Sequence, residues 1–160
     1  MSRARGALEA LFHAALDAVA PRVAVARGVK QEGERLTVAR VALPPETRCV
    51  VLAVGKAAPA MAAAFAAEAG GRVRHGLVVT KEGHGPAPGG FRGLEAGHPL
   101  PDARSEAAGA AVLATAATID PADVLVVLLS GGASALLAFP AVGLTLAELR
   151  ETTDQLLRAG

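Results

Sequence analysis

The sequence contains no tryptophan and no tyrosine, and only four of its 160 residues are phenylalanine. Proteins that bind single-stranded nucleic acids stack the bases on aromatic side chains, so this composition argues against that class of protein. Hydrophobic residues nevertheless make up 52% of the chain, which is enough for a packed core. We therefore expect one globular domain whose core consists mainly of alanine, valine and leucine.

Cysteine is almost absent, because Cys49 is the only one and no intrachain disulfide can form. It stands at the start of an apolar run, where we expect a buried thiol rather than a nucleophile. Neither sign of charge dominates, since 16 basic and 15 acidic residues give a net charge of +1. This balance argues against binding to nucleic acids or to anionic membranes through a basic face.

Long apolar runs are missing as well, and none approaches the ~20 residues needed to cross a bilayer. Residues 1–6 are basic, but charged and polar residues interrupt the next segment of the chain, unlike the apolar core of a signal peptide. We therefore expect a soluble, cytoplasmic protein.

Hydrophobic periodicity predicts helices that alternate with strands. The expected helices cover about residues 4–25 and 57–69, a segment from Asp102 or Ser105 to about 119, and a segment from the capping box at Thr145 to the C-terminus. The expected strands cover residues 36–43, 49–54, 75–81, 94–96 and 124–129. Residues 28–33 should form a polar break, and residues 82–93, with five glycines and two prolines, a structureless connection.

This alternation is typical of an α/β fold with a Rossmann-like, doubly wound, mainly parallel sheet and helices on both faces. We expect at least four parallel strands, with residues 49–54 and 124–129 at the centre, because these two runs are apolar enough to be covered on both faces. Ligands of such sheets bind at the carboxyl ends of the strands. The turns after these two strands should therefore lie at the same sheet edge.

Gly55 and Lys56 form the first of these turns. Glycine lets the backbone turn sharply, and Lys56 adds a positive charge beside the positive end of the following helix dipole. An anion between them would relieve that repulsion, although a solvated lysine at a helix start is the alternative. The turn is not a Walker A loop, because the upstream glycine is missing and Ala57 stands where Ser or Thr would bind magnesium.

The second turn consists of Ser130, Gly131, Gly132, Ala133 and Ser134. Adjacent glycines can point successive N–H groups into a concave anion-binding arrangement, a nest, which two hydroxyls flank here. The alternative is a close-packed corner that needs small residues only. The nucleophile elbow of hydrolases is excluded, because its G-x-S-x-G order is absent.

Two histidines also follow predicted strands. His98 could bind a phosphate, move a proton or order its own turn, whereas we interpret His84 as a loop residue. The four histidines are scattered and only one cysteine is present, so we expect no zinc site. The turns together predict a domain that holds an anionic, phosphate-bearing small molecule.

Four motifs, in this order and at this spacing, resemble the glycerate 2-kinases of the bacterial and animal class whose C-terminal part carries the MOFRL domain. They are Val54-Gly55-Lys56-Ala57, Val79-Thr80-Lys81-x-Gly83-His84, Glu95-Ala96-Gly97-His98-Pro99-x-Pro101-Asp102, and Leu129-Ser130-Gly131-Gly132-Ala133-Ser134-Ala135-Leu136. The resemblance covers about residues 4–160.

The resemblance implies transfer of the γ-phosphoryl group of ATP to the 2-hydroxyl of D-glycerate with Mg²⁺, in a cleft between a Rossmann-like N-terminal domain and a second domain. It makes Lys56 the implied catalytic residue. It places Gly55, His98 and the Ser130–Ser134 loop against substrate or phosphate, and it assigns no metal ligand.

The chain also departs from the family. Members are more than twice as long, so residues 1–160 correspond to the N-terminal part alone, and the second, MOFRL-containing domain is absent. We therefore expect a fragment that does not phosphorylate glycerate by itself and that self-associates as a homo-oligomer through uncovered apolar surface.

Two other functions stay open. The chain could be a non-catalytic anion-binding or interaction module left by truncation. Hydroxypyruvate reductase, a name often attached to this family, is less favoured, because no G-x-G-x-x-G dinucleotide fingerprint follows a predicted strand.

Overall fold

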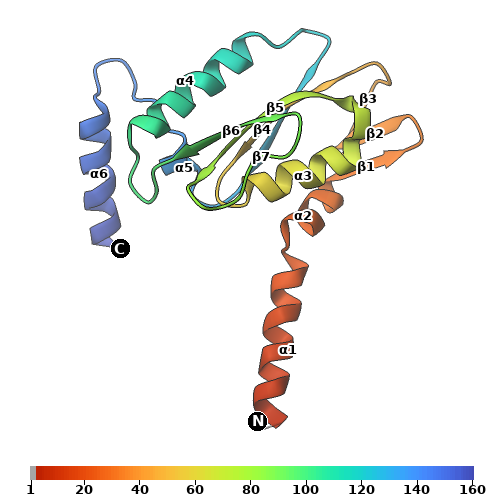
Figure 1. Ribbon diagram of the computed structural model, residues 1–160, viewed down its shortest axis with the longest axis horizontal. Helices are drawn as coiled ribbons and strands as arrows, with labels where there is room; N and C mark the ends of the chain where they lie inside the picture. The colour runs from red at the N-terminus through yellow and green to blue at the C-terminus, as the bar shows by residue number, and fades with distance from the viewer. Residues whose placement is uncertain (1–2) are drawn as a thin grey trace.

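Six α-helices and two β-sheets are found in residues 3–160, the part of the chain that the computed structural model describes (Figure 1). The helices are α1 (Arg3–Ala18), α2 (Pro21–Gly28), α3 (Ala58–Ala69), α4 (Ala103–Ala117), α5 (Ala133–Leu136) and α6 (Leu146–Ala159), with a 3₁₀ turn at Gly70–Arg72. The strands are β1 (Val29–Glu32), β2 (Arg35–Val38), β3 (Val41–Leu43), β4 (Cys49–Val54), β5 (Val73–Lys81), β6 (Phe91–Ala96) and β7 (Val124–Leu129). None of these helices is both long and apolar enough to cross a membrane.

Strands β4 to β7 form a parallel sheet in the order β6-β5-β4-β7. At its carboxyl edge Val54 lies beside Val79 on one side and beside Leu129 on the other. The chain thus adds β5 and β6 on one side of β4 and then returns to add β7 on the other, as in a Rossmann fold. The predicted fold class and the four parallel strands are confirmed.

Of the two strands predicted to be central, β4 is central and β7 is not. All six residues of β4 are buried, whereas β7 is an edge strand in which Leu125, Val127 and Leu129 are exposed. The prediction for β7 was wrong because an apolar sequence shows that a strand can be buried, not which of its faces is covered. The expected self-association through such uncovered surface stays a prediction.

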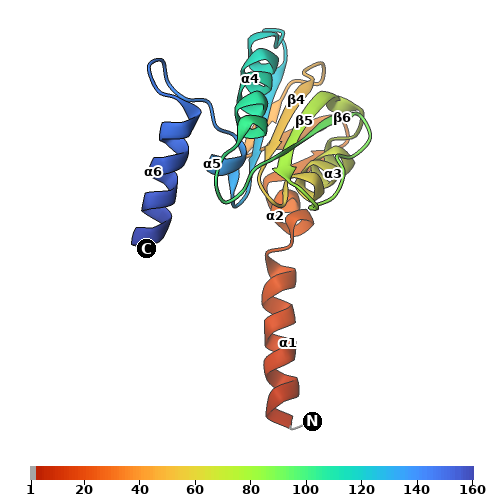
Figure 2. The ribbon, with the colours of Figure 1, turned by 60° about the vertical axis from the view of Figure 1, so that its left-hand side comes forward.

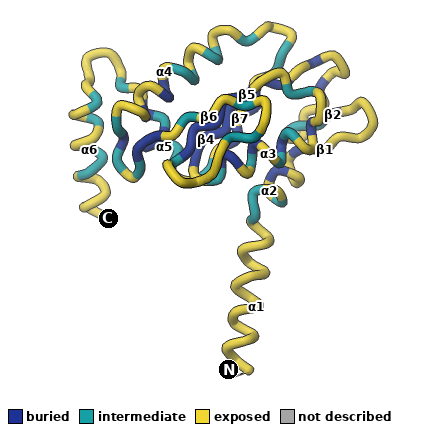
Figure 3. Tube along the Cα trace, viewed as in Figure 1, coloured by how far each residue is buried: buried dark blue, intermediate teal, exposed yellow. Residues whose placement is uncertain are grey.

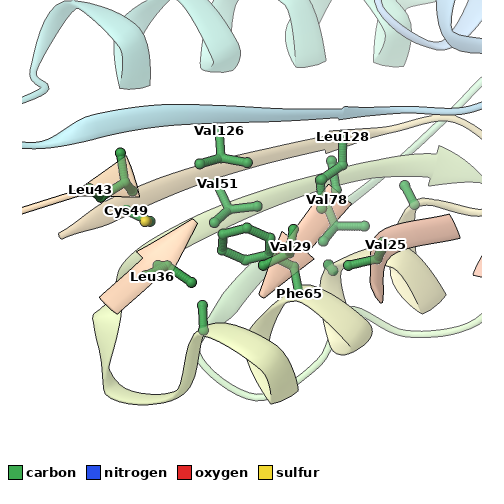
Figure 4. Packing of buried hydrophobic residues seen from close by; sticks show 14 residues of the cluster. Val25, Val29, Leu36, Leu43, Cys49, Val51, Phe65, Val78, Val126 and Leu128 are labelled. Atoms are coloured by element: carbon green, nitrogen blue, oxygen red, sulfur yellow. The ribbon is translucent and has the colours of Figure 1, made fainter. Parts of the chain in front are cut away.

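Each face of the parallel sheet packs against its own helices. On one face the fully buried Phe65 of α3 lies among Val51 and Val78 (Figure 4). On the other face, Ala108 of α4 and Leu136 of α5 cover the alternate side chains of β4 and β5. Burial of a side chain as large as phenylalanine stabilises a fold by about 1.5–3 kcal/mol.

Residues 4–25 do not form the single helix that their periodicity predicts. α1 ends at Ala18, and α2 begins at Pro21, which suits the first turn of a helix but interrupts a continuing one. α1 projects away from the domain (Figure 2) and contains no buried residue (Figure 3). Leu11 and Phe12 on its apolar stripe are 68% and 61% exposed.

A three-stranded antiparallel sheet, β1-β2-β3, adds to the α3 side of the core. Residues 36–43, expected to be one strand, form β2, a tight turn and β3, with φ angles of 48° at Ala39 and 71° at Arg40. Positive φ is uncommon for alanine and arginine. Because the turn contains neither glycine nor asparagine, the sequence does not indicate it. Residues 28–33, expected as a polar break, contain β1.

The connection from β5 to β6 passes over the same face as α3, since Ala87 packs against the core cluster that contains Phe65. It is a loop where a Rossmann fold usually has a helix. β6 begins at Phe91, three residues earlier than predicted. The ring of Phe91 lies over Gly76, where an added Cβ atom would be 2.2 Å from it.

Asp102 is the N-cap of α4. The sequence predicted that either Asp102 or Ser105 would begin this helix. Its carboxylate accepts hydrogen bonds from the backbone N–H groups of Arg104 (2.9 Å) and Ser105 (3.2 Å), and also from that of Gly97 (3.2 Å). Burial opposes ionisation of this carboxyl, but the hydrogen bonds from Arg104 and Ser105 outweigh it and lower the pKa of Asp102. Asp102 therefore also fixes the segment that carries His98.

α6 begins with the predicted capping box of Thr145 and Glu148. It contains no buried residue, and Leu156 and Leu157 are 67% and 56% exposed. The Arg150 side chain donates a hydrogen bond to the carbonyl oxygen of Pro101 (3.1 Å). This contact connects α6 to the loop before α4.

Replacing Asp102 with alanine should destabilise the domain by about 1–2 kcal/mol at neutral pH, because the first turn of α4 loses its cap. The lowered pKa means that this contribution is fully present above the unfolded carboxyl's pKa of about 4 and is lost as pH falls through the folded value. Urea denaturation of the parent and of Asp102→Ala should therefore show a large difference in the free energy of unfolding at neutral pH and a small one in acid.

Asp102→Asn is the matched control, because an amide oxygen keeps an acceptor for the helix but does not titrate in this range. At neutral pH it should cost less than the alanine variant, because the helix keeps a cap acceptor. Its own stability should lack the acid-induced loss that the titration of Asp102 gives the parent. Equal urea midpoints for the parent and Asp102→Ala at neutral pH would show that Asp102 does not act as a cap.

Candidate functional site

The turn between β4 and α3 is built on a glycine that leaves no room for a side chain. Gly55 is buried and has a φ of 122°. A Cβ atom added there would lie 2.2 Å from the Ser130 Oγ and 2.5 Å from the Ser130 carbonyl oxygen. Only glycine combines this backbone conformation with so close an approach.

Backbone hydrogen bonds join this turn to the turn after β7. The N–H of Lys56 donates to the carbonyl oxygen of Gly131 (3.0 Å), and the N–H of Ser130 donates to that of Val54 (2.9 Å). The N–H of Gly55 donates to the Val79 carbonyl oxygen at the end of β5 (3.0 Å). The two predicted turns therefore lie together at one sheet edge, where the strand order reverses.

The Ser130 hydroxyl fastens the two turns. It accepts a hydrogen bond from the backbone N–H of Ala57 (3.1 Å) and donates one to the carbonyl oxygen of Val54 (3.4 Å). A hydroxyl has one proton, and here that proton is engaged within the protein. Of the two serines in this loop, Ser134 is the exposed one.

Lys56, Gly132 and His98 meet at the centre of the site. A Cβ atom added to Gly132 would lie 2.8 Å from His98 Cδ2, 2.9 Å from His98 Nε2 and 3.5 Å from Lys56 Cε. The Lys56 side chain thus runs along the glycine backbone of the second turn, and His98 reaches the same place from the segment after β6. The structure brings together three residues that lie far apart in the sequence.

The glycine turn offers free N–H groups beside these side chains. Gly132 has a φ of 92° and a ψ of 0°, the left-handed conformation, directly before Ala133 begins α5. Within residues 3–160, the N–H groups of Gly131 and Gly132 donate no hydrogen bond. Successive free N–H groups of this kind, next to an exposed lysine, form a surface suited to an anion.

More positively charged groups act on His98 than the sequence indicated. Burial lowers the pKa of His98, and the charges of Lys56, Lys81 and His84 lower it further. The imidazole is consequently uncharged near neutral pH. The sequence analysis did not include Lys81 in the site and interpreted His84 as a loop residue. Lys81 is the last residue of β5 and His84 follows it, at the edge that holds Gly55.

A cavity of about 350 Å³ separates the glycine turn from α6. His98, Gly132 and Ser134 line one side, and Leu149, Thr153 and Leu157 of α6 line the other. The sequence alone did not indicate that any segment would face these turns. α6 supplies that second wall.

Metal ligands are not gathered at this edge. Residues 3–160 contain no group of three or more histidine, cysteine, aspartate or glutamate side chains that could hold a metal ion. The arrangement can therefore bind and orient an anion through Lys56, the N–H groups of Gly131 and Gly132, and His98, but it does not itself form a metal centre.

Comparison with known proteins agrees with this architecture. A family model described as a domain of unknown function, DUF4147, matches residues 7–160. The glycerate 2-kinase of Pyrococcus horikoshii is 36% identical over 146 residues, which cover 91% of this chain and 33% of that protein. A protein of Agrobacterium vitis with the provisional name hydroxypyruvate reductase is 36% identical over 157 residues, which cover 98% of this chain and 33% of the relative.

Among solved structures, the glycerate kinase of Thermotoga maritima superimposes with a TM-score of 0.72 at 34% identity, covering 91% of this chain and 32% of that one. The chain thus spans about a third of the length of these relatives. The matched family model, the relatives and the shared fold show that this chain belongs to the glycerate kinase family and corresponds to its N-terminal, DUF4147 portion.

Proposed function

We propose that this chain provides the phosphate-holding edge of a glycerate 2-kinase site, in which the γ-phosphoryl group of ATP passes to the 2-hydroxyl of D-glycerate. The observation that carries the proposal is the meeting of Lys56, Gly132 and His98 at the point where the strand order reverses. The name of the Pyrococcus horikoshii relative supports the choice of reaction.

The proposed reaction depends more on neutralising the negative charge of the transferred phosphoryl group than on covalent catalysis. The oxygen of the 2-hydroxyl forms a bond to the γ-phosphorus, the bond from that phosphorus to the bridging oxygen of ADP breaks, and the hydroxyl proton is released. Negative charge is spread over the transferred group throughout. We infer that the Lys56 ammonium and the N–H groups of Gly131 and Gly132 bind such oxygens. The support is that Lys56 Cε lies beside the glycine turn, whose N–H groups donate no hydrogen bond within residues 3–160.

His98 adds a hydrogen bond without adding a charge. With its pKa lowered by burial and by the neighbouring positive groups, the imidazole can donate an N–H to a phosphate or a carboxylate while staying neutral. Its position is fixed through Gly97, whose N–H is held by Asp102. We assign His98 to substrate or phosphate binding.

Mg²⁺, which the resemblance to glycerate 2-kinases implies, does not fit residues 3–160 as a protein-held ion, because no suitable cluster of ligands exists among them. Phosphate groups do fit the lysine and the free N–H groups. We propose that the remaining ligands come from the part of such kinases that this chain does not match, which is about two-thirds of their length.

A second candidate function, reduction of hydroxypyruvate, is favoured by the name of the Agrobacterium vitis relative. That reaction needs a nicotinamide dinucleotide, whose pyrophosphate usually lies on a glycine-rich turn after the first parallel strand. Here that turn reads Gly55-Lys56-Ala57 and lacks the further glycines of the fingerprint. Kinase chemistry therefore ranks first, and a test for NADH oxidation with hydroxypyruvate separates the two.

Replacing Lys56 with alanine should reduce glycerate kinase turnover by about 10²–10³-fold, the usual loss when one group that stabilises developing charge is removed. A chimaera in which residues 1–160 replace the matching part of the Pyrococcus horikoshii enzyme would supply the unmatched remainder. ADP release and melting temperature are measured together, because Lys56 is exposed and its loss should not affect folding.

Lys30→Ala is the matched control, since Lys30 is an exposed lysine on the antiparallel sheet. It should leave turnover unchanged. If the chimaera is inactive from the start, binding of inorganic tripolyphosphate to the 160-residue chain replaces turnover as the readout. Equal behaviour of the Lys56 and Lys30 variants would contradict the role of Lys56.

The 160-residue chain alone should release no ADP from ATP, Mg²⁺ and D-glycerate. Its anion-binding groups come from one sheet edge, and residues 3–160 gather no metal ligands, so the groups that neutralise the charge of the transferred phosphoryl remain incomplete. A coupled ADP assay, with the Pyrococcus horikoshii enzyme as positive control, checks this. Robust turnover by the chain would mean that the site is completed within it, for example between two copies.

The pKa of His98 should rise when Lys56 is replaced with alanine, because one of the charges that disfavour the imidazolium is then removed. NMR titration of the histidine ring protons measures this directly, with His98→Gln providing the assignment. Lys30→Ala should leave the pKa of His98 unchanged. A fall in the pKa of His98 in the Lys56 variant would show that the two groups do not interact as described.

A further inference from the structure

A second cavity opens at the carboxyl edge of the sheet, on the face that carries α3. It has a volume of about 590 Å³ and lies between β5, β6 and the loop that connects them. Its lining includes Val78, Thr80, Pro86, Ala87, Phe91 and Glu95. Pockets for small molecules commonly measure about 300–1,000 Å³ and combine apolar walls with a few polar groups.

This cavity exists because the β5–β6 connection is a loop. A helix in this connection, as in most doubly wound sheets, would fill the same face. Here residues 85–87 cross above the strands instead. The connection contributes only small residues to the lining, namely Gly85, Pro86 and Ala87. The ends of β5 and β6 are therefore left accessible from this side.

One polar group in the lining lacks a partner. Thr80 is only 2% exposed, and its hydroxyl oxygen has no hydrogen-bond partner within residues 3–160. Buried hydroxyl groups are nearly always paired, because an unpaired one costs free energy. Glu95 stands beside Thr80 in the strand register and lines the same cavity. A hydroxyl and a carboxylate side by side suit a ligand that carries hydroxyl groups of its own.

The rest of the lining is suited to a flat ring. Val78, Ala87 and Phe91 provide apolar surface farther from the sheet edge than Thr80 and Glu95, since Val78 and Phe91 come earlier along their strands. The cavity thus has a polar end near the carboxyl edge and an apolar end behind it.

The polar end faces the direction of the phosphate-holding turns. Thr80 directly follows Val79, whose carbonyl oxygen accepts the hydrogen bond from the Gly55 N–H (3.0 Å). Lys81 is next in the chain and is one of the charges felt by His98. A ligand that extends from the cavity across the end of β5 would therefore pass Lys81 and reach Lys56.

We propose that this cavity binds the nucleoside of the phosphate donor. The base lies against Phe91, Val78 and Ala87, the ribose hydroxyls bond to Thr80 and Glu95, and the phosphates extend across β5 to Lys56. This proposal rests on the proposed kinase function and adds to it the place where the donor is recognised.

Calorimetric titration of the 160-residue chain with ATP and with inorganic tripolyphosphate tests the proposal. Both ligands present the same phosphate chain, but only ATP carries a nucleoside. ATP should bind at least about tenfold more tightly, which corresponds to about 1.4 kcal/mol. Equal affinities, or no binding at millimolar ATP, would overturn the assignment of the cavity.

Thr80→Val separates nucleoside recognition from folding. Valine has the same shape as threonine and removes an unpaired buried hydroxyl, so the melting temperature should stay the same or rise. ATP affinity should fall several-fold toward that of tripolyphosphate, while tripolyphosphate affinity stays unchanged. Glu95→Gln should act in the same direction, and Glu32→Gln, an exposed carboxylate on β1, is its matched control.

The two proposals fail in different ways. If Lys56→Ala and Lys30→Ala bind tripolyphosphate with equal affinity, the proposed phosphate site is overturned. A preference of the chain for ATP over tripolyphosphate would then still support the nucleoside site. Unchanged ATP affinity in both Thr80→Val and Glu95→Gln would overturn the nucleoside site and leave the phosphate site standing. Photolabelling with 8-azido-ATP adds an independent readout, since the label should fall within residues 85–95, and label confined elsewhere would overturn the proposal.

Discussion

The contact between Gly55 and Ser130 is the constraint on which the anion-holding edge depends. Because Gly55 has no side chain, the backbone of the β7 turn can approach the β4 turn closely enough for Lys56 to bond Gly131 and for the Ser130 hydroxyl to bond Ala57. These bonds leave the N–H groups of the glycine turn unused. The geometry that binds an anion is thus a by-product of how two strand ends are fastened together.

The same edge gathers positively charged groups around His98. Lys56, Lys81 and His84 all disfavour the charged form of His98, so His98 stays neutral beside the lysines. An anion that binds the native state at these groups would stabilise the fold by mass action. Binding and stability are therefore linked at this site, and the lowered pKa of His98 is the kind of perturbation that is common where functional groups gather.

Much of the site could be predicted from the sequence because its motifs are local: a glycine and a lysine after β4, and a glycine pair after β7. Their meeting followed from the rule that parallel strands end at one edge. The edge position of β7 could not be predicted, since it depends on which elements cover each face. Nor could the turn at Ala39 and Arg40, where packing of β2 onto the core overrides residue preference, or the hydroxyl of Thr80, whose lack of a partner is visible only in three dimensions.

α1 has a consequence for how the molecule melts. Its 16 residues make no buried contact, and an isolated helix of that length is marginal in water. Its amide protons should exchange with solvent independently of the sheet, since local opening there need not break the core. Loss of total helicity and loss of the buried environment of Phe65 would then follow different curves on heating. A single melting temperature would not describe both parts of this chain.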